Sequence, residues 1–163
     1  MTKREFEVTD PVEIQKILQE SKILHLGLID EGTPYIVPMN YGYTFENGKI
    51  ILYLHSAVEG YKLDVIGKNA TCCFEMECGV EPFAGKIACQ YGVAYYSLMG
   101  RGKAVIVDDV AEKEKAMALL MKAQTGKDFE FDEKLVSIVS VIRLDIDEYT
   151  AKHRPAPPVK FEE

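Results

Sequence analysis

Residues 52–64 combine side chains and backbone groups that bind phosphate. We expect a strand here, then a polar turn, then a helix that begins at about Gly60. A helix N-terminus attracts anions because its first amides are unpaired and carry partial positive charge. His55 and Ser56 could donate hydrogen bonds to such an anion, and Lys62 could add a positive charge. The alternative is an ordinary strand-to-helix turn with a solvated lysine.

A second stretch, residues 35–43, has features of a site for a flat heterocycle. Pro38 carries no amide hydrogen, so neighbouring groups of a β-ladder lose a partner. The backbone from Val37 to Asn40 could then hydrogen-bond a ring. A pleated strand with aromatic packing is the alternative, and this stretch alone favours it.

The four cysteines, which could suggest a metal site, are Cys72, Cys73, Cys78 and Cys89. Their spacing differs from the paired C-x-x-C pattern of zinc sites. Adjacent strand residues point to opposite faces, so Cys72 and Cys73 cannot easily share an ion. We therefore expect reduced thiols in the core and no metal.

Length and charge limit the class of protein. The 163 residues suit a single domain over residues 1–163. A net charge of −7 argues against nucleic-acid binding, which needs a basic surface. No apolar run approaches the roughly 20 residues of a membrane helix, and the first ten residues lack the apolar region of a signal peptide. We expect a cytoplasmic protein with no membrane or nucleic-acid partner.

The hydrophobic pattern predicts three helices and six strands. The helices are expected at 11–20, 61–68 and 110–125, the first capped by Thr9 or Asp10. The pair Asn47-Gly48 predicts a type I′ hairpin turn. The segment 78–90 is expected to be irregular, and the chain from about 152 to form an extended tail. The expected strands are 23–29, 35–45 (interrupted or at an edge near Pro38), 50–54, 71–77, 93–107 and 135–146.

Short turns between consecutive strands predict antiparallel pairing. Six strands with two-faced patterning can close into a barrel and so remove their edges. The fold class is therefore mainly β with peripheral helices. A doubly wound parallel fold is excluded, because helices are absent between most strands.

Three further features receive plain structural interpretations. His25 is expected to be a packed or interface residue rather than a catalytic base. The acidic residues from Asp108 to Glu114 lie at a helix start, where the macrodipole favours negative charge. Arg101, between two glycines of a strand, could pair with an acidic residue across a dimer.

Four runs of sequence resemble the pyridoxamine 5′-phosphate oxidase-like split-barrel flavoproteins. The nearest branch is the nitroimidazole-resistance-protein group, and the resemblance covers roughly residues 10–154. The runs are P-Y-I-V-P-M-N-Y-G-Y (34–43), L-Y-L-H-S-A-V-E-G-Y-K-L-D (52–64), I-G-K-N-A-T-C-C-F-E (66–75) and Y-Y-S-L-M-G-R-G-K-A (95–104).

The resemblance implies a six-stranded antiparallel split β-barrel that forms a homodimer. It implies FMN in symmetric clefts at the subunit interface, with the isoalloxazine ring beside one stretch of backbone. The residues of that stretch are Val37, Pro38, Met39, Asn40 and Tyr41.

The resemblance also implies contacts to the rest of the cofactor. Tyr96 and Ser97, with Tyr95, are expected to approach the flavin from the partner subunit, and the segment 152–154 to close the pocket. The residues implied at the ribityl phosphate are His55, Ser56, Ala57, Gly60 and Lys62.

The implied function is that of an FMN-dependent oxidoreductase. Electrons would pass from a reduced nicotinamide or similar donor to a small acceptor, such as a nitroaromatic or a quinone. The chain lacks the second arginine–lysine set with which pyridoxamine phosphate oxidases hold their substrate, which argues against vitamin B6 oxidation. The alternatives are a flavin- or haem-binding or sensing protein without turnover, with His55 as haem ligand, a deazaflavin protein, or a dimer whose pocket has degenerated.

Overall fold

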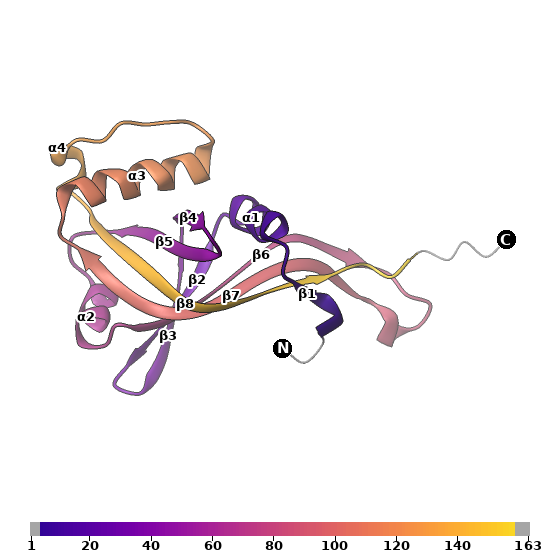
Figure 1. Ribbon diagram of the computed structural model, residues 1–163. Coiled ribbons are helices and arrows are strands. Elements are labelled where there is room, and N and C mark those ends of the chain that lie inside the picture. Colours follow the sequence, from indigo (N-terminus) through magenta and orange to yellow (C-terminus); the bar gives the residue numbers. More distant parts are fainter. Residues whose placement is uncertain (1–3, 159–163) are drawn as a thin grey trace.

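An antiparallel sheet organises the chain in the computed structural model, which describes residues 4–158 (Figure 1). Within these residues the sheet has eight strands, in the order β3-β2-β6-β7-β8-β5-β4, with β1 added to β8. The strands are β1 (Glu7–Val8), β2 (Leu24–Asp30), β3 (Thr33–Met39), β4 (Gly42–Glu46), β5 (Lys49–Ser56), β6 (Thr71–Phe83), β7 (Gly92–Val107) and β8 (Ser140–Arg154).

Four α-helices lie around the sheet in the described part of the chain. They are α1 (Pro11–Glu20), α2 (Tyr61–Lys68), α3 (Val110–Thr125) and α4 (Glu133–Val136). The three predicted helices are confirmed with their bounds. Two 3-10 turns, η1 (Arg4–Phe6) and η2 (Ala88–Gln90), complete the elements.

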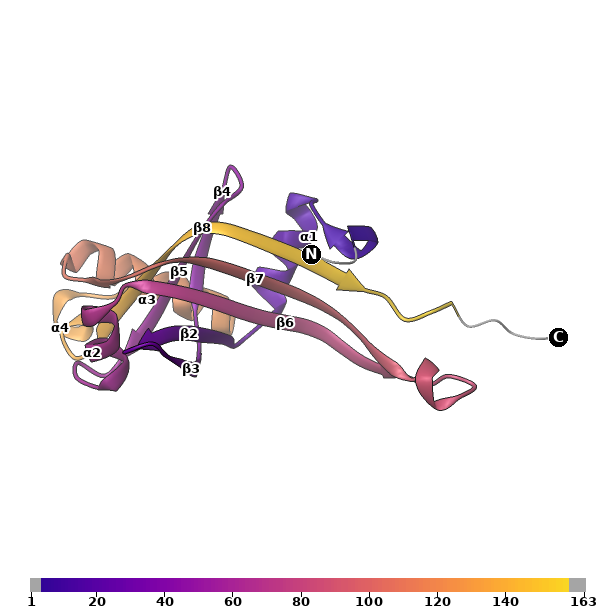
Figure 2. The same ribbon diagram turned by 90° about the horizontal axis from the view of Figure 1, so that it is seen from below.

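Strands β6, β7 and β8 are long, curved and side by side (Figure 2). One half of these strands belongs to the barrel, and the other half extends beyond it as an arm that carries η2 (Figure 1). The β7–β8 ladder is irregular at Arg101 and Gly102, because Asp147 of β8 is an extra residue without a partner on β7.

The core lies inside the barrel and follows the predicted alternation. Leu24, Leu26 and Leu28 of β2 are buried on one face. Tyr41 is completely buried, and its hydroxyl lies 2.9 Å from the carbonyl oxygen of Leu18. That contact satisfies a polar group that would otherwise be costly to bury, and it holds the end of α1 on the barrel.

The predicted six strands become eight for two reasons. β1 was not predicted, and the predicted strand 35–45 is divided into β3 and β4 at residues 40–41 rather than at Pro38. Pro38 pairs with His25 inside β3. A proline is tolerated there because β3 ends the sheet order and needs no ladder on its outer side, as the edge interpretation predicted.

Three predicted boundaries were wrong: two strands are extended by their partners, and a short helix replaces the predicted start of the last strand. Strand β5 continues through Ser56, and β6 continues through Phe83 across the segment expected to be irregular. The end of β6 pairs with β7, from which its residues obtain ladder hydrogen bonds. Leu135 lies in α4, which Asp132 caps, so the last strand begins only at Ser140.

The predicted extended tail is only partly a tail in the structure. The segment 152–154 is part of β8 and pairs with β7, whereas residues 155–158 have no regular structure. The remainder of the predicted tail lies outside the described residues. At the hairpin between β4 and β5, Asn47 and Gly48 have φ of 51° and 76°, which confirms the predicted turn.

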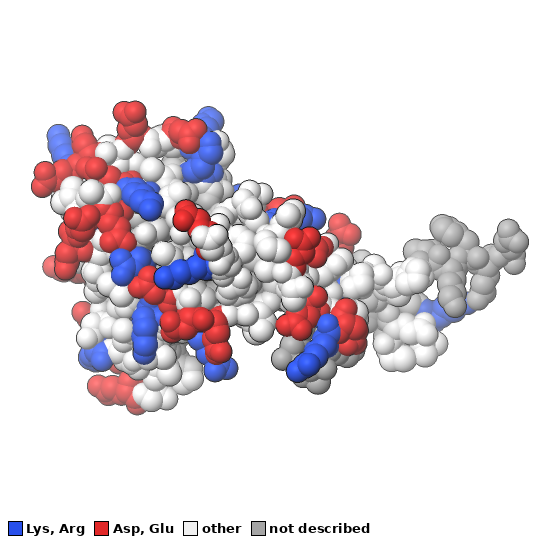
Figure 3. Space-filling view, viewed as in Figure 1, with Lys and Arg blue, Asp and Glu red and all other residues white. Residues whose placement is uncertain are grey.

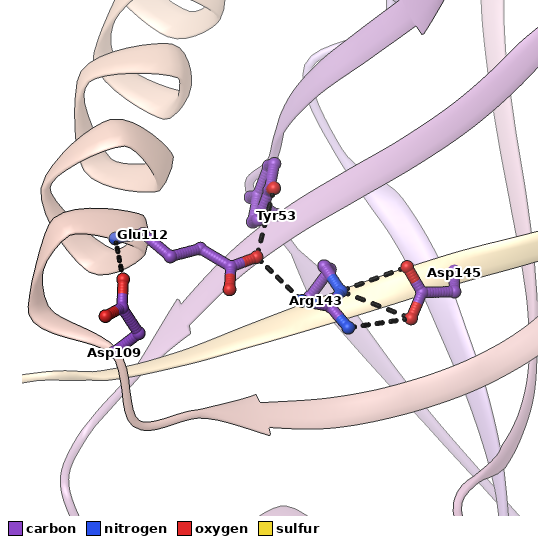
Figure 4. A network of polar contacts seen from close by, with 5 residues as sticks. All are labelled: Tyr53, Asp109, Glu112, Arg143 and Asp145. Atoms are coloured by element: carbon purple, nitrogen blue, oxygen red, sulfur yellow. Dashed lines mark hydrogen bonds and ion pairs between the residues drawn. The ribbon is translucent and has the colours of Figure 1, made fainter.

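A polar network fixes α3 to the sheet (Figure 4). The Arg143 guanidinium donates to Glu112 Oε1 at 2.8 Å and to Asp145 Oδ1 at 3.0 Å. Tyr53 donates to the same Glu112 oxygen at 3.2 Å, while Asp109 caps α3 by accepting from the Glu112 amide. The acidic helix start therefore does more than complement the macrodipole, because one carboxylate holds an arginine of β8.

We predict that Arg143→Met lowers the free energy of unfolding by about 2 kcal/mol, measured by urea denaturation. The substitution leaves the half-buried carboxylates of Glu112 and Asp145 without their cation. Arg101→Met is the control, because the Arg101–Glu148 pair is largely exposed and should contribute less than about 0.5 kcal/mol. Equal effects of the two variants would contradict a special role for this network.

We predict that Gly42→Ala destabilises the fold by about 1–3 kcal/mol. An added Cβ at Gly42 would collide with the backbone of α3 at Leu120, which cannot yield as a flexible side chain does. Gly67→Ala is the matched control, since Gly67 lies inside α2 with open space around it and the change should be neutral or stabilising. Thermal unfolding of both variants measures the difference, and a neutral Gly42→Ala would contradict this close packing.

Candidate functional site

The N-terminus of α2 differs from those of the other α-helices in the described chain. Asp10, Asp109 and Asp132 cap α1, α3 and α4 by accepting a hydrogen bond from a backbone amide. No side chain caps α2, whose N-cap is Gly60 with φ of 147°. Such a φ favours glycine, and nothing lies within 4 Å of the place where a Cβ would stand. The first amides of α2 therefore remain open to an external acceptor.

Ser56 and Lys62 bring matching donors to this helix start. Lys62 Nζ donates to Ser56 Oγ at 3.1 Å, and Ser56 is buried at the end of β5. Among the described residues no carboxylate forms an ion pair with Lys62, so its charge adds to that of the helix terminus. We call Ser56, Gly60, Lys62 and the first turn of α2 the phosphate niche. This set is the part of the predicted site that the structure brings together.

His55 does not join that set. It is adjacent to Ser56 on β5, so the two side chains leave opposite faces of the strand. Its Nδ1 is buried without a hydrogen-bond partner, which is uncommon for a buried polar atom. His55 was predicted in a turn beside the phosphate, and the continuation of β5 to Ser56 explains the difference. Ala57, which follows Ser56, is exposed beside the niche.

The stretch 37–41 offers backbone rather than side chains. Strand β3 ends the sheet order, so one side of its backbone has no ladder. Met39 and Tyr41 are buried in the core, and Val37 packs against it. Asn40 Nδ2 donates to the Lys22 carbonyl oxygen at 3.3 Å, so this side chain is engaged within the chain. A ring beside this stretch would therefore meet main-chain groups of β3.

Tyr61 makes two contacts that the sequence did not predict. One joins the start of α2 to β2, and the other joins it to β3. Tyr61 is the first residue of α2, and its hydroxyl donates to Asp30 Oδ2 at the end of β2, at 2.6 Å. This hydrogen bond is the main reason that the pKa of the Asp30 carboxyl lies below its usual value. The Tyr61 ring also packs edge-on against Tyr35 of β3 at 5.0 Å. Neither contact has a local sequence signal, because each joins residues at least 26 positions apart.

Tyr96 and Ser97 lie on the arm half of β7, whereas α2 lies at the opposite end of the molecule (Figure 1). Tyr96 stacks on His153 of β8 with ring centroids 3.8 Å apart. Lys152 donates to Tyr95 at 3.1 Å, so the basic segment 152–154 is engaged on the arm. These residues do not reach the niche of their own chain. Their predicted approach from a partner subunit stays a prediction.

The cysteines are all free in the structure. Cys72 and Cys78 are buried as predicted, but Cys73 and Cys89 are exposed. Burial raises the pKa of the Cys72 thiol to about 12, so this group stays a thiol at neutral pH. The predicted opposition of Cys72 and Cys73 on one strand is confirmed by their burial pattern.

The surface charge is mixed. Figure 3 shows Lys and Arg interspersed with Asp and Glu on the face drawn, without a continuous basic area. In the described part of the chain, no helix is both long and apolar enough to cross a membrane.

Comparison with known proteins identifies the family. Residues 10–153 match the sequence model of the pyridoxamine 5′-phosphate oxidase family. The chain belongs to this family. No curated protein sequence matches it. The predicted resemblance and the predicted split-barrel fold are both confirmed.

Solved structures support this assignment. A proposed 5-nitroimidazole antibiotic resistance protein from Bacteroides thetaiotaomicron is 31% identical, with a TM-score of 0.76 over 90% of this chain and 86% of that one. The flavocytochrome Anf3 from Azotobacter vinelandii is 19% identical, with a TM-score of 0.75 over 97% and 73%. An FAD- and haem-binding protein from Mycobacterium smegmatis is 15% identical, with a TM-score of 0.75 over 93% and 75%. The last two similarities show a shared fold.

Proposed function

We propose that the protein binds FMN and acts as an oxidoreductase on a small-molecule substrate. The observation that carries this proposal is the phosphate niche: an uncapped helix start with a buried hydroxyl and an unpaired lysine in a chain of net charge −7. Donors of this kind suit a phosphomonoester, because they supply positive charge and amide hydrogens together. Membership of the pyridoxamine 5′-phosphate oxidase family adds support.

The residues present fit the two ends of FMN. Ser56, Lys62 and the amides of α2 would hold the phosphate, and the open backbone edge of β3 would hydrogen-bond the ring. The Tyr61–Asp30 hydrogen bond would keep these two parts in register. Bound flavin supplies two-electron chemistry, which here would carry electrons from a reduced nicotinamide or similar donor to a small acceptor such as a nitroaromatic or quinone. The similarity to the proposed nitroimidazole resistance protein favours a nitroaromatic acceptor.

A second candidate function is flavin or haem binding without turnover. The buried, unpartnered Nδ1 of His55 favours it, because a neutral imidazole can ligate haem iron. Two structural neighbours are described as a flavocytochrome and as an FAD- and haem-binding protein.

The protein is also proposed to be a cytoplasmic homodimer with the cofactor at the subunit interface. Apolar side chains flank the niche and the β3 edge without cover: Ile36, Val58 and Tyr61 are 67%, 56% and 54% exposed. A second copy would shield these side chains and close the cofactor site. The four free cysteines are consistent with a reducing compartment.

We predict that Lys62→Glu weakens FMN binding about tenfold or more, measured by flavin fluorescence titration of the apoprotein. The variant replaces a cation at the niche with a carboxylate that repels phosphate. Lys115→Glu, at an exposed position of α3 outside the site, is the charge-matched control and should leave FMN affinity unchanged. Wild-type affinity in Lys62→Glu would remove the niche from the site.

The same preparation separates turnover from storage. Anaerobic addition of NADH or NADPH should bleach the flavin absorbance of the wild-type protein within seconds. Tight FMN without bleaching by any donor would favour the binding function instead. A Soret band that His55→Ala abolishes would identify a haem protein, and failure to take up flavin or haem would contradict both functions.

We predict that Ile36→Glu converts the dimer into monomer at micromolar protein concentration, measured by light scattering after size-exclusion chromatography. A charge at this exposed apolar position opposes burial against a second copy. Val12→Glu is the control, because Val12 is similarly exposed but lies on α1. A monomeric wild-type protein with bound FMN would contradict the proposed interface.

A further inference from the structure

A histidine and two glutamates meet on the outer face of the sheet, away from the barrel core. His25 lies on β2, and Glu75 and Glu77 lie on the neighbouring strand β6. His25 and Glu75 are directly paired across the two strands, and Glu77 is two residues further on. Residues two apart on a strand share a face, so all three side chains project from the same side of the sheet.

Their ligand atoms already lie close together. His25 Nδ1 is 3.3 Å from Glu75 Oε2 and 4.0 Å from Glu77 Oε2. One ligand atom of His25, one of Glu75 and one of Glu77 all lie within 4.8 Å of one another. Bonds of about 2.0–2.2 Å to one ion would place ligand atoms roughly 3–3.6 Å apart. Small side-chain rotations would therefore bring the three ligand atoms to the distances that one bound ion requires.

The two carboxylates have no strong cation to neutralise them. Within residues 4–158, neither forms an ion pair with a lysine or arginine. The neighbouring basic side chains are engaged elsewhere: Arg101 pairs with Glu148, and Lys152 donates to Tyr95. Ligand oxygens of Glu75 and Glu77 lie within 4.8 Å of each other. Two carboxylates this close repel each other when both are ionised and no cation lies between them.

We propose that His25, Glu75 and Glu77 form a binding site for one divalent first-row transition metal ion, separate from the phosphate niche. One imidazole nitrogen and two carboxylate oxygens are a mixed N/O set that suits such ions better than the oxygen-only sets of Ca²⁺ or Mg²⁺. An ion here would replace the mutual repulsion of the carboxylates with attraction. The histidine distinguishes this cluster from an exposed acidic patch.

Three protein ligands leave further coordination positions open. His25 and Glu75 also line a hollow of about 540 Å³ on the same face, together with Met99 and Thr150. The open positions could therefore take water or a small ligand from this hollow. None of the three ligand residues belongs to the phosphate niche, so ion binding is tested independently of flavin. The hollow also includes Ile36, so the proposed second copy would lie beside it.

The test uses the full-length wild-type protein, stripped with a chelator and titrated with Co²⁺ alone. We expect one Co²⁺ per chain, with weak visible bands typical of nitrogen and oxygen ligands. Glu77→Gln and His25→Ala should each weaken the affinity about tenfold or more. Glu81→Gln is the matched control, since it removes an exposed carboxylate from the same strand, β6, outside the cluster.

Folding is checked separately from binding. Without metal, Glu77→Gln should melt at the wild-type temperature or above it, because it relieves a like-charge contact. With Co²⁺, only the wild-type and control proteins should gain thermal stability. Absence of stoichiometric binding would overturn the proposal. So would binding that Glu77→Gln leaves unchanged, or an intense sulfur-to-metal band that assigns the ion to cysteine.

Discussion

The pairing of β7 with both β6 and β8 is the constraint on which the rest of the structure depends. It joins strands that carry the barrel at one end and the arm at the other (Figure 2). The close approach at Gly102, where a Cβ would meet the backbone of Asp145, coincides with the bulge that divides these regions. A side chain there would separate β7 from β8, so both barrel closure and the direction of the arm depend on this contact.

Barrel closure determines which parts of the sheet remain open for chemistry. The sheet order ends at β3 on one side and β4 on the other, although these strands are consecutive in the chain. The open edge of β3 is therefore a consequence of topology rather than of Pro38 alone. Helix α2 packs against β2, and the Tyr61–Asp30 hydrogen bond fixes its uncapped start near this edge. An anion site and a main-chain edge thus become parts of one surface.

The sequence predicted features whose cause is local. The bounds of α1 and α3 had local signals, and Asp10 and Asp109 cap these helices in the structure. The hairpin followed from Asn47-Gly48. The Ser56–Lys62 contact was within reach because six residues separate the two side chains. The extension of β6 and β8 was not predictable, since β7 supplies their hydrogen bonds from a distant part of the chain. For the same reason the Arg143 network and the His25–Glu75 contact had no local signal, and His55 was expected in a turn although β5 extends past it.

Each proposed site contains charged side chains that lack a partner of opposite charge among the described residues. In a chain of net charge −7, Lys62 at the α2 terminus stays free of carboxylate partners, which preserves its attraction for phosphate. The outer sheet face has the reverse arrangement, because Glu75 and Glu77 adjoin each other while Arg101 pairs with Glu148. Both arrangements cost folding energy, since a partner of opposite charge would stabilise either one. A ligand that supplies the missing charge recovers that energy as binding affinity, so the two positions favour an anion and a cation respectively.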